Sequence, residues 1–365
     1  KFEKYSWILT GGGLGVLHLT IYAAFQYYHM ISQTAAFGFM ILVTMMGIIL
    51  SIWANAEMIA GLAIIGGFLT PSLISTGTAN DVTFFTYLGL LSLGIFFISF
   101  FKKWQHLMLL GFIGMMFNFL PWYEKFYTKE KLVFTMVVLG AFYLIYLAAG
   151  VMANIATRQR ANNGDLFLFT INPAWFFGWG YALLYPEYEH LLGFFAAALS
   201  ACYIFFAYLG SLFASEDRRL ILSLGGIAVV FLTIAVPLQL DGNAITIAWA
   251  AEAVVLFTLG MLLGEEKLRF FGLIVLTIAI IRLFSYDSNT PDLALFVPVI
   301  NRRFLTYLMT IGAIAVIGYV VATYRSMVSS QERIVPALIA LLFNVLLVGS
   351  ITMEISTFFS AKLFY

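Results

Sequence analysis

The chain is a succession of long apolar stretches that are separated by short polar turns. Most stretches approach the roughly 20 residues that an α-helix needs to cross a bilayer. Unbroken apolar runs lack the alternation that a membrane strand requires, so strands are not expected. The pattern predicts an all-α polytopic transmembrane bundle of about thirteen helices, over residues 7–28, 32–52, 57–70, 83–101, 106–120, 132–154, 164–184, 190–213, 220–238, 246–263, 269–285, 304–325 and 334–358.

Two of these stretches, 57–70 and 106–120, are short for a full span. They fit half-helices or helices packed inside the bundle, where irregular or short elements are covered by protein. The longest outer loop, 285–303, carries an apolar island that fits an interfacial helix or a re-entrant segment.

Glycines recur near the ends of the helices that lead into one set of turns. They follow one another at intervals of 47, 56, 60, 50 and 58 residues: Gly47, Gly94, Gly150, Gly210, Gly260 and Gly318. The stretches from Gly61 to Pro71 and from Gly111 to Pro121 align at an offset of 50 residues. A repeating unit that holds two spans keeps its orientation, so we expect tandem antiparallel hairpins in parallel repeats of about 50–60 residues. The alternative is coincidence, because glycine is common in membrane helices.

Glycines also cluster inside two helices, at Gly11–Gly13 with Gly15 and at Gly66–Gly67. Apolar side chains gain little by leaving lipid for protein, so membrane helices associate through close packing at small residues. We therefore expect helix contacts at both clusters. For the Gly11–Gly13 run the alternative is a hinge or a kink.

Composition supports the membrane assignment, since 62% of the residues are hydrophobic and only 10% are charged. Soluble domains carry roughly 25% charged residues, so the solvent here is lipid and membrane lipids are the expected partners. A net charge of +1 gives no case for a nucleic-acid partner. The single Cys202 and four scattered histidines offer no metal site. No phosphate-binding loop, zinc-protease helix or nucleophile elbow is present, so we expect no cofactor.

The predicted turns place basic residues unevenly on the two sides of the membrane. Twelve lie on the side of the N-terminus and seven on the opposite side, if Arg282, which is near the membrane edge, is included. By the positive-inside rule, the richer side, which includes the N-terminus, is cytoplasmic. We therefore expect a multi-pass membrane protein whose N-terminus lies in the cytoplasm. The apolar stretches form a single transmembrane domain over residues 1–365, and the abrupt start at Lys1 predicts a fragment of a longer chain.

Glu252 is the leading candidate for a functional residue because it stands in an apolar helix, where a charge costs roughly 2.5–3.5 kcal/mol. With the following turn centred near Lys267, Glu252 lies fifteen residues before the centre and Arg282 fifteen after it. Equal distances from the turn of an antiparallel hairpin predict similar depth, so the two side chains can meet. A structural pair, a carboxylate- or phosphate-binding or proton-linked site, and an Arg282 that reaches the interface alone all remain open.

Two further polar residues of helices are candidates for binding. His18 stands in the first helix, where a hydrogen bond to a neighbouring helix and a ligand or proton-relay role are the alternatives. Asn172 precedes Pro173 in the seventh helix, and the proline predicts a kink or a break that builds a site. Asn118 and Asn344 are expected to donate hydrogen bonds between helices, and Glu354 is expected to be paired.

Three stretches carry a resemblance to a known family: GGGLGVLHLTIYAAF (11–25), GGFLTPSLISTG (66–77) and PLQLDGNAITIAWAAEAVVLFTLG (237–260). In order and spacing they resemble the bacterial polytopic membrane proteins grouped as domain of unknown function 2339, over most of residues 7–285. Members of this family tend to be longer, often with a soluble or coiled-coil amino-terminal part. The family pattern has glycine after the helix acid, whereas this chain has Ala253. The resemblance implies the topology and a location in the bacterial inner membrane, and it carries no assigned activity.

The sequence favours a transporter-like or lipid-handling protein with an intramembrane polar site that includes Glu252, Arg282, His18 and Asn172. The alternatives are a membrane enzyme that acts on a lipid-linked substrate, with Glu252 as acid or base, and a non-catalytic envelope scaffold. An enzyme is the less favoured of these classes. A homo-oligomer or an envelope protein partner is compatible with each of them.

Overall fold

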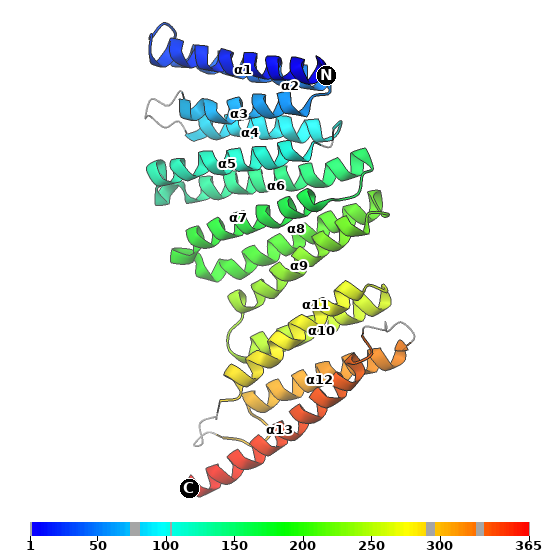
Figure 1. Cartoon of the computed structure of the whole chain (residues 1–365). Coiled ribbons are helices and arrows are strands. Elements are labelled where there is room, and N and C mark those ends of the chain that lie inside the picture. Colours follow the sequence, from blue (N-terminus) through cyan, green and yellow to red (C-terminus); the bar gives the residue numbers. More distant parts are fainter. Residues whose placement is uncertain (1, 74–80, 103, 290–295, 326–331, 365) are drawn as a thin grey trace. The chain divides into compact units, whose positions relative to one another are not determined.

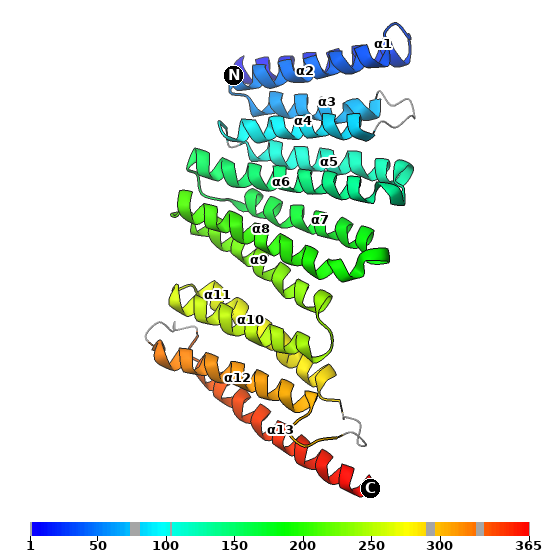
Figure 2. The ribbon, with the colours of Figure 1, turned by 180° about the vertical axis from the view of Figure 1, so that it is seen from behind.

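The computed structural model describes residues 2–73, 81–102, 104–289, 296–325 and 332–364, which form helices and turns without a strand. Figures 1 and 2 show these helices from two sides. The α-helices are α1 (Phe2–Gln26), α2 (Gln33–Ala54), α3 (Glu57–Leu73), α4 (Asp81–Ser99), α5 (Gln105–Phe126), α6 (Leu132–Thr157), α7 (Asn163–Tyr188), α8 (Leu192–Phe213), α9 (Arg218–Gln239), α10 (Asn243–Leu262), α11 (Glu266–Arg282), α12 (Arg302–Thr323) and α13 (Val335–Phe364).

The predicted helices are confirmed, and each coincides with one predicted apolar stretch. One expectation was wrong, because the helix predicted over 106–120 continues to Phe126 and has 22 residues. Pro121 lies inside it without ending it. By contrast, α3 has 17 residues and is the shorter apolar helix that the sequence predicted.

The helices have the length and the surface that a bilayer requires. Within the described ranges, eleven stretches are long and apolar enough to cross a membrane, and one of them, 163–213, contains both α7 and α8. Large apolar side chains face outward, among them Leu42, Phe97 and Val133, each at least 60% exposed. Such exposure is unfavourable in water and neutral in lipid. The molecule is therefore an all-α multi-pass membrane bundle.

The described chain divides into two compact units, which we treat separately. The first comprises residues 1–183 and 205–224. In it α3 packs on α5 and α4 on α6, so consecutive hairpins lie side by side in the same direction (Figure 1). Polar contacts fix this register: the amide of Asn118 donates to the Phe68 carbonyl at 2.9 Å, and the Tyr146 hydroxyl lies 3.0 Å from Ser92 Oγ. The interhelical role predicted for Asn118 is confirmed.

The second unit comprises residues 184–204 and 225–365. Here α10 packs against α11 and α12, and α12 packs against α13. The buried core of these four helices is apolar and includes Phe257, Val275, Ile314 and Ile317. Asn344 of α13 donates only within its own helix, to the Ala340 carbonyl at 2.7 Å, and it is exposed. The interhelical bond predicted for Asn344 is wrong, because its amide bonds within α13 and, although it lines the space between α12 and α13, reaches no acceptor on α12 among the described residues.

Three of the six glycines in the two predicted clusters make close contacts. A Cβ added at Gly66 would stand 2.7 Å from the His18 ring, and one at Gly67 would stand 3.1 Å from Thr44. Gly11 lies against Leu62. However, Gly12, Gly13 and Gly15 have no described neighbour within 4 Å, so packing does not explain them. Their face of α1 lies outside its contacts with α2 and α3.

Candidate functional site

Glu252 lies at mid-depth of a membrane helix. The turn Asp241–Gly242–Asn243 starts α10, with Gly242 at the positive φ of 55° that glycine adopts without strain. Glu252 is the tenth residue of this 20-residue helix, about 14 Å from its start at 1.5 Å per residue. The side chain is buried, with 8% of its surface exposed. An apolar helix thus holds a carboxyl group near the centre of a span.

The carboxyl group of Glu252 faces α9. Thr233 Oγ1 donates a hydrogen bond to Glu252 Oε1 at 2.8 Å, and Trp249 Nε1 donates to the Thr233 carbonyl at 3.0 Å. The other carboxyl oxygen, Oε2, is buried and has no partner among the described residues. Trp249 stands one turn before Glu252 on the same helix, so both side chains point toward Thr233. Within the described ranges, Glu252 therefore has a single hydrogen-bond donor in an apolar surrounding.

Arg282 is the last residue of α11 and faces the turn that precedes α10. Its Nη2 donates to the Gly242 carbonyl at 3.2 Å, and its guanidinium lies 5.1 Å from the centroid of the Tyr286 ring. Its Nε is buried and has no described partner. These contacts place the guanidinium of Arg282 at the end of the α10–α11 hairpin, whereas Glu252 lies near the middle of α10.

Glu252 and Arg282, both within the described chain, form no ion pair, so the predicted contact is wrong. The reason is the position of the turn. Gly260 lies against Arg269 and Gly272 against Phe257, and both pairs are centred between residues 264 and 265, not on Lys267. This register puts Glu252 level with Thr277. Arg282 is five residues farther on, about 7.5 Å along the axis at 1.5 Å per residue.

A second buried acid lies near Arg282 that the sequence did not single out. After α11 the chain forms a π-helical turn, η3 (Leu283–Asp287), which buries Asp287. Thr246 of α10 donates its hydroxyl to Asp287 Oδ2, and the Ser288 hydroxyl lies 2.6 Å from that of Tyr307 on α12. π-Helical turns are frequent at functional sites. The sequence carries no signal for this turn, and residues 285–303 were expected to be a loop.

His18 links the first three helices within the first unit. Its Nδ1 lies 3.0 Å from the Leu14 carbonyl, its Nε2 lies 3.3 Å from Thr44 Oγ1 of α2, and its ring packs on Gly66 of α3. Both ring nitrogens are thus occupied. The contact with Thr44 agrees with the first alternative for His18, a hydrogen bond to a neighbouring helix. A ligand or proton-relay role for His18 stays a prediction.

Asn172 also belongs to the first unit and joins two helices. Its Nδ2 donates to the Tyr143 carbonyl of α6 at 2.9 Å, and the side chain is 1% exposed. α7 continues through Pro173 as one helix, so of the two predicted alternatives, a kink or a break, the break is absent. His18 and Asn172 contact different residues within the first unit. Glu252 and Arg282 likewise contact different residues within the second unit.

Two buried ion pairs hold the second unit at the ends of its helices. Arg269, 2% exposed, donates to both carboxylate oxygens of Glu332 at 2.7 and 2.8 Å. Arg303 Nη2 lies 3.2 Å from Glu354 Oε2, and Glu354 Oε1 also accepts from Asn301 and from the Val299 N–H. The pairing predicted for Glu354 is confirmed. The partners could not be predicted from the sequence, because Arg269 and Glu332 are 63 residues apart and Arg303 and Glu354 are 51 residues apart.

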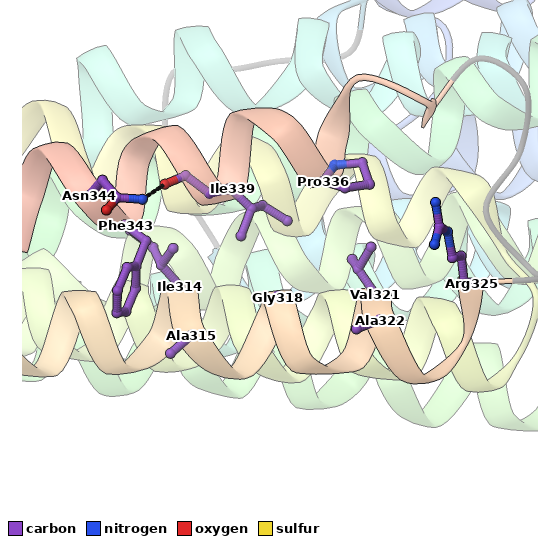
Figure 3. A pocket seen from close by; sticks show the side chains of 11 residues that line it. Ile314, Ala315, Gly318, Val321, Ala322, Arg325, Pro336, Ile339, Phe343 and Asn344 are labelled. Carbon is purple, nitrogen blue, oxygen red and sulfur yellow. Dashed lines mark hydrogen bonds between the residues drawn. The ribbon is translucent and has the colours of Figure 1, made fainter.

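An open apolar pocket of about 500 Å³ lies between α12 and α13 (Figure 3). It has one basic residue, Arg325, at one end and the amide of Asn344 at the other. A second apolar pocket of about 480 Å³ lies on α1 and is lined by residues that include Val16, Thr20 and Tyr28. None of the four candidate residues lines either pocket. In the part of the chain described, His, Cys, Asp and Glu side chains form no group of three or more that could hold a metal ion.

The model of one protein family, described as "Predicted membrane protein (DUF2339)", matches residues 1–363. No curated protein and no solved structure shows significant similarity to the chain.

Proposed function

The chain belongs to the DUF2339 family of predicted membrane proteins, and we propose that it is a transporter-like protein in which Glu252 is an intramembrane proton site. One observation carries the proposal. Glu252 Oε2 is buried at mid-span and has no described partner, while Oε1 accepts one hydroxyl hydrogen bond.

An ionised carboxylate inside a span needs a cation or several donors, because the bilayer does not solvate its charge. Glu252 has neither. A neutral carboxyl group needs fewer hydrogen-bond partners than an ionised one. Thr233 donates to one oxygen, and the O–H group on the other oxygen can donate a hydrogen bond to a water molecule or a solute. Such a group can release and take up a proton when water or solute reaches it. This is the chemistry that proton-linked transport requires.

Glu354 supports the proposal by contrast. Both acids are buried, at 8% and 7% exposure, and both lie in long apolar helices. Glu354 has Arg303, Asn301 and the Val299 N–H around its two oxygens. It is satisfied as a fixed anion, as structural acids in proteins are. Glu252 lacks these partners, so a purely structural role does not explain its presence.

The alternatives fit the contacts less well. An enzyme would need acid and base to converge, and Arg282 lies about 7.5 Å along the axis from the level of Glu252. A scaffold would need Glu252 and Arg282 to satisfy each other, and each has an atom that lacks a described partner.

The test uses proteoliposomes on a solid-supported membrane, where a pH step produces a transient current if protons bind inside the protein. We expect a current from the wild type, its loss in Glu252→Gln, and partial retention in Glu252→Asp. Glu124→Gln, an exposed acid at the end of α5, is the control and should keep the current. An undiminished current in folded Glu252→Gln would refute the proton site.

We also propose that the protein lies in the bacterial inner membrane with its N-terminus in the cytoplasm. The support is the excess of basic residues on the turns of that side, which includes the Arg218–Arg219 pair at the start of α9.

A further inference from the structure

The pocket between α12 and α13 runs along one face of each helix. On α12 the lining residues Ile314, Gly318 and Val321 recur every three or four positions, which is the spacing of one helix face, and Arg325 follows two residues after the helix ends. From Ile314 to Thr323, the last residue of α12, this face rises about 14 Å at 1.5 Å per residue. That length is about half of a hydrocarbon core of roughly 30 Å, which is the depth of one lipid leaflet.

The pocket is lined mainly by apolar side chains, and small residues of α12 form its base. Gly318 and the neighbouring Ala315 and Ala322 carry little or no side chain, so the two helices enclose a furrow. A Cβ added at Gly318 would stand 3.3 Å from Ile339 of α13. Neighbouring helices pack about 8–10 Å apart, which leaves a furrow too narrow for a third helix. An acyl chain, which has no side chains, fits such a furrow.

One end of the pocket is basic. Figure 3 shows Arg325 reaching from the end of α12 toward Pro336, in the first turn of α13. Arg325 is exposed and has no partner among the described residues, and the same is true of Arg333, two residues before α13. The nearby acid Glu332 is already bound by Arg269 on both oxygens. This end therefore presents uncompensated positive charge beside a helix N-terminus, which also favours anions.

We propose that this pocket binds one anionic phospholipid, with an acyl chain between α12 and α13 and the phosphate at Arg325. The acyl chain gains little over the bilayer itself, because lipid is as apolar as the pocket. Selectivity therefore comes from the headgroup, where a guanidinium binds phosphate oxygens through two N–H groups. The site is independent of the role proposed for Glu252, whose contacts are with α9.

The test is native mass spectrometry of the whole purified protein in detergent, titrated with phosphatidylglycerol and with phosphatidylcholine of the same acyl chains. We expect Arg325→Gln to weaken phosphatidylglycerol binding about fivefold, the effect of one arginine near an anionic surface, and to remove the preference over phosphatidylcholine. Arg325→Lys should keep the preference. Gly318→Leu and Ala322→Phe, which fill the furrow, should weaken the binding of both lipids.

Matched controls lie on the same helix. Gly312 of α12 has no described neighbour within 4 Å, and Arg302 is exposed at the opposite end, so Gly312→Leu and Arg302→Gln should leave binding unchanged. Glu252→Gln should also bind both lipids as the wild type does. Phosphatidylglycerol binding that survives both Arg325→Gln and Ala322→Phe would overturn the proposal. So would a loss of dimers in Ala322→Phe with lipid binding intact, which would make the furrow an interface between two copies.

Discussion

Arg303 and Glu354 show how a membrane helix of this protein accommodates a charged side chain. Both residues are 7% exposed, and Arg303 also donates to Thr357 Oγ1 at 2.9 Å. Removing one member of a buried pair leaves the other charge uncompensated, whereas removing both with apolar residues of similar size is often neutral.

We predict that Arg303→Met lowers the free energy of unfolding by about 3 kcal/mol, and that Arg303→Met/Glu354→Met restores most of this loss. Thermal unfolding of the detergent-purified variants measures both. Equal destabilisation of the single and the double variant would show that the pair is not the cause.

Among the described residues, Asn172 makes a single hydrogen bond between helices, and its loss costs less stability than the loss of one member of a buried ion pair. Its hydrogen bond to the Tyr143 carbonyl joins α6 to α7. Hydrogen bonds between membrane helices contribute on average about 0.6 kcal/mol. We therefore expect Asn172→Ala to lower the melting temperature only slightly in the same unfolding assay. A collapse of the fold in this variant would give Asn172 a larger role than one hydrogen bond.

At the scale of elements, the α10–α11 hairpin depends on close backbone contact. A Cβ added at Gly260 would stand 2.7 Å from the backbone nitrogen of Arg269, and one at Gly272 would stand 2.9 Å from that of Phe257. Backbone atoms cannot give way as a flexible side chain can. The turn itself contains Gly264 at a φ of 68°, which favours glycine.

We predict that Gly260→Ala destabilises the protein by about 1–3 kcal/mol, because the two helices must separate to admit the methyl group. Gly312→Ala on α12 meets open space and serves as the matched control, which should lose no stability. Thermal unfolding compares the two. Similar stability for both variants would contradict the close packing at Gly260.

The same hairpin shows what the sequence could and could not predict. The helices were predictable because each one is a long apolar stretch bounded by polar turns. The pairing of Glu252 with Arg282 depended on the centre of the turn, which lies between residues 264 and 265, and an error of two to three residues there moves the partners about 7.5 Å apart. Asp287 was missed because a π-helical turn has no sequence signal. The partner of Arg269 was missed because Glu332 is 63 residues away.

At the scale of the whole molecule, we expect successive helices to cross the membrane in alternate directions. α9 tests this, since its two ends carry different charges: Arg218 and Arg219 at the start and Asp241 just after the end. By the positive-inside rule the start of α9 lies in the cytoplasm.

The single Cys202 makes the measurement simple. In a Cys202→Ala background, we expect Ser215→Cys, before α9, to react with a membrane-impermeant maleimide only after the cells are opened. Asp241→Cys, after α9, should react in intact cells. Reaction of both cysteines from the same side would contradict the crossing by α9, and the reverse pattern would contradict the orientation.

We expect Glu252 to be a neutral, proton-exchanging carboxyl group in an apolar span, and labelling with dicyclohexylcarbodiimide tests this most directly. This apolar reagent adds to protonated carboxyl groups and leaves ionised, paired carboxylates unmodified. Mass spectrometry of the labelled protein should find the adduct on Glu252 and not on Glu354, which is equally buried but bound to Arg303. An unlabelled Glu252, or equal labelling of Glu252 and Glu354, would contradict the account.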